Sequence, residues 1–178
     1  FFFLFFLSVF PATASSVPEV TPSLTAKQKN NSDAAVVIGN ENYRRLPQVV
    51  YAQNDAKAVS QFLKVTRRIP SWKTTVLNNA TKKDIEQALH KRSRYLSKKA
   101  TLWVYYAGHG YTDKQGNRYL VPIDADPNEP LKDAIELNEM MTKISKRGNR
   151  VVLIVDSSFG NVGRDGLPVF DVEQSHMP

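Results

Sequence analysis

A histidine and a pair of serines stand where two apolar, β-rich runs of the chain end. The run up to Ala107 is followed by His109 between two glycines, and the run Val151–Val155 is followed by Asp156-Ser157-Ser158. Histidine is the commonest general base, and a serine hydroxyl becomes a nucleophile beside such a base. If both runs are buried parallel strands, their carboxyl ends meet at one sheet edge, where ligands bind. The pattern predicts a hydrolase active site that uses His109 and Ser158.

The segments around these residues alternate between strand and helix patterns. Continuous apolar runs predict strands at 34–38, 74–77, 101–106 and 151–155. Helical spacing of apolar residues predicts helices at 54–63, from the capping-box pair Thr81 and Asp84 to residue 96, and around 137–144 before Gly148. Gly116-Asn117 predicts a hairpin turn. This alternation is typical of an α/β fold with a parallel sheet and right-handed crossovers.

The N-terminus has the composition of a targeting segment. Phe1–Phe10 is almost wholly apolar, and the A-x-A pattern Ala12-Thr13-Ala14 follows it. We interpret 1–14 as a signal peptide with a truncated start and expect export; an uncleaved membrane anchor is the alternative. Residues 15–32 are rich in Ser, Thr, Pro, Asn and Lys, which predicts a disordered linker.

Composition limits the chemistry of the chain. It has no cysteine, which excludes disulfides, thiolate metal sites and a thiol nucleophile from the sequence as written. No metal site is indicated, because His90 lies in a basic helix and His176 in the tail. The formal net charge is +7, and much of the excess lies in one segment: Lys82, Lys83, Lys91, Arg92, Arg94, Lys98 and Lys99. Without a binding motif or interleaved aromatics, this segment predicts a solvated helix face, and we expect no nucleic-acid partner.

Several motifs, in order, resemble the caspase-like cysteine peptidases, most closely the metacaspase type. They are Val37–Tyr43, Asn54–Ala56, Tyr105–Gly110, Tyr119–Ala125 and Asp156–Ser158. The resemblance implies a three-layer α/β sandwich, with a mainly parallel sheet and helices on both faces. It assigns 33–160 to the large-subunit part of the domain and 161–178 to a loop and tail, so the family's C-terminal strands are missing.

The resemblance also implies roles for individual residues. His109 matches the catalytic histidine, Ser158 occupies the position of the catalytic cysteine, and the backbone N–H of Gly110 would polarise the substrate carbonyl. Asp55 and Asp156 match the paired carboxylates that hold a basic P1 side chain, the residue before the cleaved bond. The alternative is that Asp55 is only a helix N-cap and Asp156 only a strand-end residue. Metacaspase-type relatives also suggest calcium activation, although no ligands can be assigned here and no other cofactor is implied.

The function expected from this pattern is cysteine-type endopeptidase activity after Arg or Lys, absent or very weak because serine replaces the thiol. A hydroxyl has a far higher pKa than a thiol and needs a tightly held base. The alternatives are a non-catalytic pseudo-peptidase that binds peptides or acts as a scaffold, and a true serine hydrolase. The sequence leaves open whether Ser158 is natural or introduced. Expected partners are a peptide with a basic P1 residue and, at the open edge of the 151–155 strand, a C-terminal subunit or a second copy.

Overall fold

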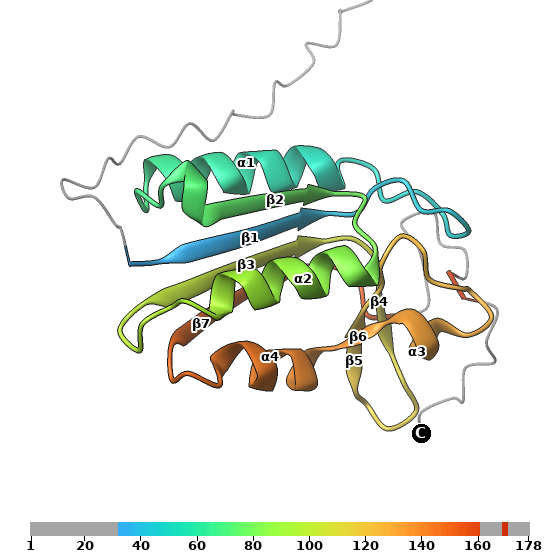
Figure 1. Cartoon of the computed structure of the whole chain (residues 1–178). Helices are drawn as coiled ribbons and strands as arrows, with labels where there is room; N and C mark the ends of the chain where they lie inside the picture. Colours follow the sequence, from blue (N-terminus) through green and yellow to red (C-terminus); the bar gives the residue numbers. More distant parts are fainter. Residues whose placement is uncertain (1–31, 161–168, 171–178) are drawn as a thin grey trace, which may run out of the picture.

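A four-stranded parallel sheet forms the centre of the molecule. The computed structural model describes residues 32–160 and 169–170, and the strand order is β2-β1-β3-β7 (Figure 1). These strands are β1 (Ala34–Gly39), β2 (Thr74–Asn78), β3 (Thr101–Ala107) and β7 (Arg150–Asp156). Each of the four predicted strands is therefore present, and they run parallel as expected.

The central strands β1 and β3 are covered on both faces. Every residue of β1 is buried, and in β3 all but Trp103 are buried, which explains why both sequences are apolar at nearly every position. The register pairs Val37 with Tyr105 and Ile38 with Tyr106. Because side chains alternate along a strand, Val37 and Tyr105 share one face, and Ile38 and Tyr106 share the other.

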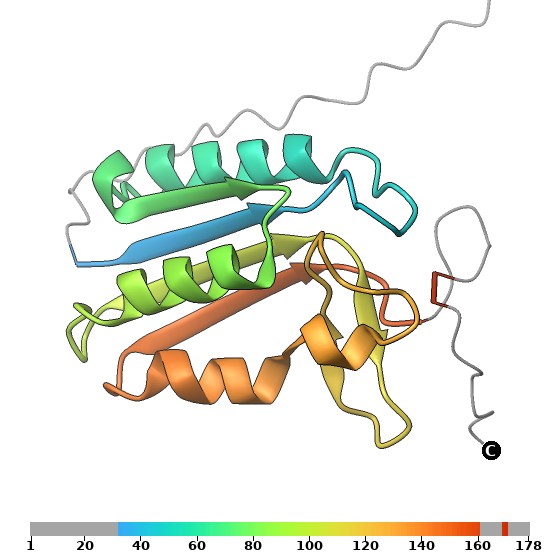
Figure 2. The ribbon, with the colours of Figure 1, turned by 45° about the vertical axis from the view of Figure 1, so that its right-hand side comes forward.

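Helices cover the sheet on both sides, giving three layers (Figure 2). Helix α1 (Ala52–Val65) packs on the face that carries Val37 and Tyr105. The opposite face, with Ile38 and Tyr106, is covered by α2 (Lys82–Ser93) and α4 (Leu137–Ser145). This arrangement confirms the predicted α/β class with a mainly parallel sheet and helices on both faces.

Local signals fix where the helices begin and end. Thr81 and Asp84 form the predicted capping box at the start of α2, and Gly148, after α4, has φ 75°. At Gly39 an added Cβ would lie 2.6 Å from the carbonyl oxygen of Ala52. Glycine at this position therefore allows α1 to start directly against the end of β1.

A small antiparallel sheet follows β3. It consists of β4 (Gly110–Thr112), β5 (Arg118–Leu120) and β6 (Ile135–Glu136), in that order; the short helix α3 (Pro130–Asp133) and the 3₁₀ turn η1 (Ser71–Lys73) complete the elements. The predicted hairpin turn joins β4 to β5, where the Asp113 carboxylate accepts hydrogen bonds from the backbone N–H groups of Gln115 and Asn117. Gly116 has φ 85°, which favours glycine there.

Several predictions concern residues beyond those just described. The signal peptide predicted at 1–14, the linker up to residue 31 and most of the tail predicted at 161–178 lie outside the described residues. Within the described part of the chain, no helix has both the length and the apolar character needed to cross a bilayer.

Candidate active site

The two predicted catalytic residues follow neighbouring strands at the same sheet edge. Ala107, the last residue of β3, pairs with Asp156, the last residue of β7. His109 and Ser158 each lie two residues beyond that pair. The Gly108 N–H donates to the carbonyl oxygen of Asp156 at 3.4 Å. This hydrogen bond keeps the segments that follow β3 and β7 side by side just beyond the strands. His109 and Ser158 therefore follow neighbouring strands at the same carboxyl edge of the sheet.

A backbone carbonyl orients the imidazole of His109. The side chain is 9% exposed, and its Nε2 lies 2.8 Å from the carbonyl oxygen of Pro47, in the loop between β1 and α1. A carbonyl can only accept, so Nε2 must carry the proton, and Nδ1 holds the lone pair of the neutral ring. The Tyr43 ring packs against the imidazole with 4.6 Å between centroids. The contact with Pro47 therefore favours the tautomer with its proton on Nε2.

Two phenols hold the backbone of the histidine. The Tyr43 hydroxyl accepts the His109 N–H at 2.8 Å and lies 3.0 Å from the carbonyl oxygen of Val121, to which it donates. The Tyr106 hydroxyl lies 2.8 Å from the His109 carbonyl oxygen and 2.7 Å from that of Val121. Burial raises the pKa of Tyr43 to about 12 and that of Tyr106 well above its ordinary value, so both remain neutral hydrogen-bond donors.

The glycines on either side of His109 are required by close packing. A Cβ at Gly108 would lie 2.6 Å from both phenol oxygens, and one at Gly110 would lie 2.7 Å from Phe159 Cδ1 and Ser157 Oγ. Hydrogen bonds across the hairpin join residues 121 to 109 and 113 to 117, which makes Gly110 and Leu120 a non-hydrogen-bonded pair. The Gly110 N–H therefore points away from β5, as an oxyanion donor requires.

The two serines at the end of β7 have different environments. Ser157 is half-buried, and its hydroxyl lies beside Gly110 and donates to the Ser158 carbonyl oxygen at 3.4 Å. Ser158 is exposed, and its hydroxyl would lie 3.7 Å from a Cβ added at Gly160. Of the two, Ser158 is therefore the one open to an incoming substrate.

The charges of both predicted specificity carboxylates act on one phenol, that of Tyr105. Asp156 pairs in register with Ala107, which places it on the α1 face of the sheet with Tyr105. The Tyr105 hydroxyl donates to Asp156 Oδ2 at 3.4 Å. Burial raises the pKa of Tyr105 most, and the negative charges of Asp156 and Asp55 raise it further. Asp156, from the end of β7, thus contacts the Tyr105 hydroxyl, and the charge of Asp55, from the first turn of α1, acts on the same phenol.

Asp55 does not cap α1. The N-cap residue is Tyr51, with φ 74° and no side-chain cap, and Asp55 lies in the first turn, half-buried. The Gln53 N–H at the start of the helix donates instead to the Glu41 carboxylate at 3.1 Å. The capping interpretation of Asp55 is therefore wrong, and its carboxylate is available for another role.

Comparison with known proteins identifies the family. The family model described as "Caspase domain" matches residues 32–176. The chain belongs to the caspase domain family. It is similar to the human "Mucosa-associated lymphoid tissue lymphoma translocation protein 1", with 33% identity over 110 residues; the match covers 62% of this chain and 12% of that protein. A solved structure of a Geobacter sulfurreducens protein shares the fold, with a TM-score of 0.55 at 17% identity, covering 71% of this chain and 50% of that one.

The described residues of this caspase domain form no candidate metal-binding site. Residues 32–160 and 169–170 contain no group of three or more His, Cys, Asp or Glu side chains that could hold an ion. Calcium prefers six to eight oxygen ligands. The side chains of these described residues therefore do not supply the ligand set that calcium prefers.

Sequence reasoning missed the groups that position His109. Tyr43 and Tyr106 lie inside the motifs quoted for the family, but nothing in the sequence separates a structural phenol from a packing aromatic. The contribution of Pro47 comes from a backbone carbonyl, which every residue has, so no residue type could signal it. Tyr105 falls on the buried run of β3, where apolar packing is the default interpretation.

Proposed function

We propose that this caspase domain is a cysteine-type endopeptidase domain that selects Arg or Lys at P1, and that Ser158 makes it inactive or very weak. The proposal is supported above all by Asp156, which accepts a hydrogen bond from Tyr105, and by Asp55, whose negative charge also acts on that phenol. A pair of carboxylates is complementary to a guanidinium or ammonium group and repels an acidic P1 side chain.

The proposed chemistry divides between three groups. Nδ1 of His109 would take the proton of the nucleophile at position 158 and return it to the leaving amine. The Gly110 N–H would donate to the oxyanion that develops on the scissile carbonyl. In a cysteine form the imidazolium would stabilise a thiolate, which attacks the carbonyl directly.

Serine is poorly suited to this arrangement. A hydroxyl must lose its proton during the attack, and serine enzymes stabilise the resulting imidazolium with a buried carboxylate. Here the acceptor at Nε2 is the neutral carbonyl of Pro47, which carries no charge to offset the imidazolium. In serine peptidases, disabling that carboxylate lowers kcat on the order of 10⁴-fold, so we expect slow or undetectable hydrolysis.

The decisive experiment restores the thiol. Hydrolysis of fluorogenic peptides with Arg, Lys or Asp at P1 would be compared for the unchanged chain, Ser158→Cys and the matched neighbour Ser157→Cys, each with calcium and with a chelator. The proposal expects cleavage after Arg and Lys by Ser158→Cys alone. Cleavage after Asp, or equal activity of Ser157→Cys, would contradict the assigned pocket or nucleophile.

The second candidate is a pseudo-peptidase that binds without cutting, favoured by a P1 pocket that does not include Ser158. It predicts that the unchanged chain binds an Arg-ended peptide aldehyde and that Asp156→Ala abolishes this binding, with Asp126→Ala as an exposed carboxylate control. If neither Ser158→Cys nor the unchanged chain cuts while binding persists, this candidate replaces the first. Labelling of Ser158 by a fluorophosphonate would instead favour a serine hydrolase.

The outer edge of β7 is the proposed site for a partner. Within the described residues β7 is the last strand of the sheet, and on its α1 face Val152 is half-buried and Ile154 is 44% exposed. We propose that a further strand, from a C-terminal subunit or a second copy, pairs here. Sedimentation of the chain alone would distinguish the two: a dimer that Ile154→Lys dissociates supports a second copy, and a monomer supports a separate subunit.

We also propose that the protein is exported. The support is the apolar run Phe1–Phe10 followed by the Ala12-Thr13-Ala14 pattern. N-terminal sequencing of the secreted protein should find a start near Ser15. An intact Phe-rich start on membrane-bound protein would favour the anchor instead.

A further inference from the structure

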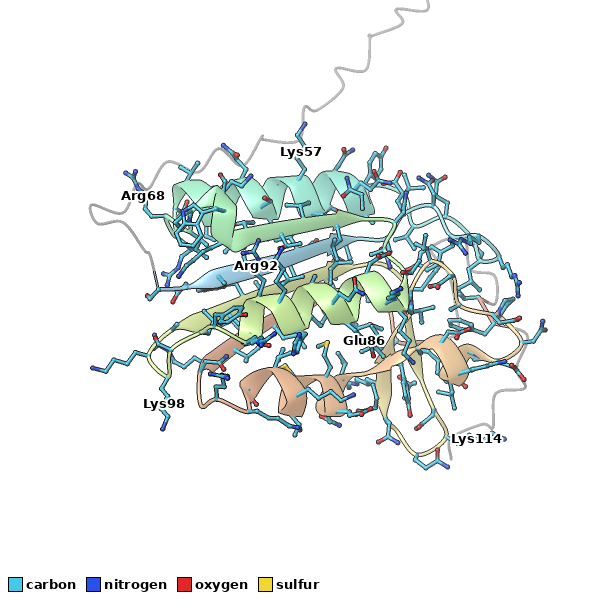
Figure 3. The ribbon with its side chains drawn as sticks, viewed as in Figure 1. Lys57, Arg68, Glu86, Arg92, Lys98 and Lys114 are labelled. Carbon is cyan, nitrogen blue, oxygen red and sulfur yellow. The ribbon has the colours of Figure 1, made fainter. Side chains whose placement is uncertain are left out.

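The end of the sheet opposite the candidate active site is strongly basic. Helices run back from the carboxyl edge, so their last turns and the loops that follow gather where the strands begin. The Lys and Arg residues there, which we call the basic pole, are Arg67, Arg68, Lys73, Lys91, Arg92, Arg94, Lys98, Lys99, Lys146, Arg147 and Arg150. Figure 3 shows Arg68 and Lys98 at this end and Lys114 at the other.

Almost no negative charge offsets the basic pole. Among the described residues, the acidic side chain at this end is that of Asp33, which is 5% exposed. Its carboxylate accepts from the Thr101 N–H at 2.8 Å and from Trp103 Nε1 at 3.3 Å. Asp33 is thus committed to joining β1 to β3, and the surface presents positive charge alone.

Helix stability does not account for the whole pole. Cations in the last turn of a helix interact favourably with its negative end, which explains Lys91 and Arg92 in α2. Lys98 and Lys99 lie in the loop before β3, and Arg150 begins β7. All three are exposed. These positions lie beyond the last turns, so the clustering needs another explanation.

Exposed aromatic rings lie among these charges. Trp72 is 68% exposed and Tyr95 is 77% exposed. Lys73 Nζ lies 5.1 Å from the Trp72 ring centroid, and the Arg94 guanidinium lies 5.2 Å from that of Tyr95. The linear sequence predicted a plain solvated helix face. Trp72 lies before β2 in the chain, and only the fold brings it next to the end of α2. Tryptophan and tyrosine favour the headgroup level of a bilayer, with basic residues beside them.

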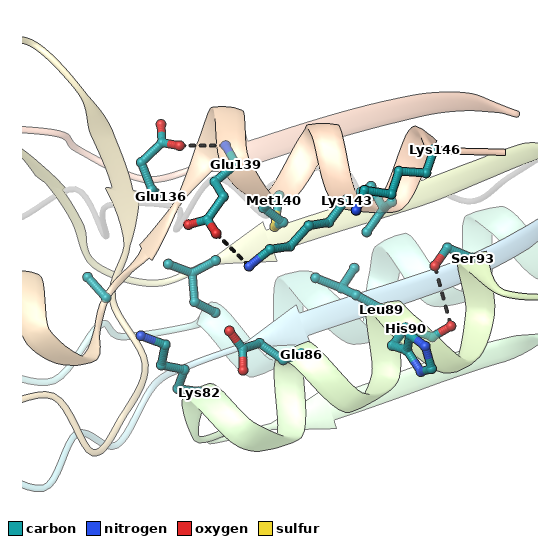
Figure 4. A pocket seen from close by; sticks show the side chains of 13 residues that line it. Lys82, Glu86, Leu89, His90, Ser93, Glu136, Glu139, Met140, Lys143 and Lys146 are labelled. Carbon is teal, nitrogen blue, oxygen red and sulfur yellow. Dashed lines mark hydrogen bonds and ion pairs between the residues drawn. The ribbon is translucent and has the colours of Figure 1, made fainter. Parts of the chain in front are cut away.

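A pocket at the pole has the size and charge for a phosphate headgroup. A groove of about 700 Å³ runs between α2 and α4, and Figure 4 shows its side chains. Near the start of α2 its charges are mixed, and Glu139 there pairs with Lys143 at 2.7 Å. At the basic pole it meets a smaller pocket of about 240 Å³. The basic residues lining that pocket are His90, Arg94, Lys143, Lys146 and Arg147, of which Lys143 is the one paired with Glu139, and no acidic residue lines it.

We propose that the basic pole docks on an anionic phospholipid surface, with a lipid phosphate in the pocket between the ends of α2 and α4 and with Trp72 and Tyr95 at headgroup depth. One feature favours a membrane over a nucleic acid: the exposed rings of Trp72 and Tyr95 flank a broad charged end.

The proposed orientation leaves the candidate active site free. β3 and β7 each span seven residues from the basic pole to the carboxyl edge, about 23 Å at 3.3 Å per residue. His109 and Ser158 would therefore face away from the lipid, toward soluble substrates. This inference does not depend on the proposed peptidase activity, because none of the lipid-facing residues belongs to the candidate active site.

The test is co-sedimentation of the full chain with phosphatidylcholine vesicles, with and without phosphatidylglycerol. The pole variant combines Arg68→Gln, Lys98→Gln and Lys99→Gln. Its matched control combines Lys57→Gln, Lys83→Gln and Lys114→Gln, which removes the same charge from exposed positions elsewhere. Each basic residue near an anionic surface changes affinity about five-fold, so the pole variant should bind on the order of a hundred-fold more weakly, with little change in the control.

Tryptophan fluorescence gives a second readout, because the chain has only Trp72 and Trp103. Anionic vesicles should shift the emission to the blue, and Trp72→Phe should remove the shift. Equal binding to neutral and anionic vesicles, equal losses in the pole and control variants, or a shift that survives Trp72→Phe would overturn the proposal. Retention on duplex DNA without vesicle binding would overturn it in favour of a nucleic-acid surface.

Discussion

Removing the Tyr43 hydroxyl should damage the frame of the candidate site more than removing that of Tyr106, although Tyr106 is the more deeply buried. In Tyr43→Phe, the His109 N–H loses its acceptor at 2.8 Å. In Tyr106→Phe, both carbonyl oxygens near the lost hydroxyl keep a donor. The His109 carbonyl oxygen still accepts from the Val121 N–H at 3.1 Å, and the Val121 carbonyl oxygen still accepts from the Tyr43 hydroxyl at 3.0 Å.

The difference has a physical magnitude. A donor that loses its partner inside the protein costs about 1–3 kcal/mol, whereas losing a hydrogen bond while both partners stay satisfied costs about 0.5–1.5 kcal/mol. For a chain of this length, each kcal/mol lowers Tm by roughly 2–4 °C. Tyr43→Phe should therefore lower Tm by roughly 2–12 °C, and Tyr106→Phe by roughly half as much.

Thermal and urea unfolding of both variants would measure this ranking, with Tyr95→Phe as a control. Tyr95 is 77% exposed, so its loss should stay within about 0.5 kcal/mol. If Tyr106→Phe proves as costly as Tyr43→Phe, or if Tyr43→Phe matches the control, the hydrogen-bond network does not hold His109 as described.

Three further predictions concern the fold. Gly39→Ala would place a Cβ 2.6 Å from the Ala52 carbonyl oxygen and 2.9 Å from Gln53 Cα. Urea unfolding should therefore find that the free energy of unfolding falls by about 1–3 kcal/mol. Gly160→Ala, the control, should have little effect. Asp33→Ala removes the acceptor for the Thr101 N–H, and we expect a comparable loss from calorimetry; unchanged stability would argue against its role in joining β1 to β3. Hydrogen bonds from the Thr81 side chain and backbone lower the pKa of Asp84 below 3.8. The ionised Asp84 carboxylate therefore stabilises the folded state fully above its unfolded-state pKa, and this contribution disappears as the pH falls through its folded-state pKa. Thr81→Ala should cost about 1 kcal/mol near neutral pH, and the difference from the unchanged chain should shrink below about pH 4; a constant difference would contradict the capping box.

The fold was predictable because its strongest signals are local. The continuous apolar runs of β1 and β3 reflect burial on both faces, and the Thr81–Asp84 pair marks the start of α2. The start of α1 was predicted two residues late, because Tyr51 caps it with a left-handed backbone, and the acceptor for the Gln53 N–H comes from Glu41, twelve residues away. Non-local capping of this kind leaves no pattern near the helix.

The candidate site was predictable only where a residue type signals chemistry. His109, Ser158 and the two aspartates stand out by type and by their place after apolar runs. The Pro47 carbonyl does not, and neither does the direction of the Gly110 N–H, which follows from the pairing of β4 with β5. The basic pole was missed for a similar reason, because its members come from three separate stretches of the chain, 67–73, 91–99 and 146–150, which only the parallel topology gathers.

The hydrogen bonds that position the backbone of His109 also stabilise the fold, and this limits what the presence of the histidine motif implies about activity. Tyr43, Tyr106 and Val121 hold the histidine backbone while they join β3 to the small sheet, so any substitution that loosens the site also weakens the fold. The Ser158 side chain takes no part in these hydrogen bonds, because it is exposed at the strand end. Selection for folding alone would therefore preserve the two tyrosines and the close-packed glycines around position 109, whichever residue occupies position 158. An intact frame around His109 is accordingly no measure of turnover in this chain, and only the comparison of the unchanged chain with Ser158→Cys separates a working peptidase frame from one kept for its stability.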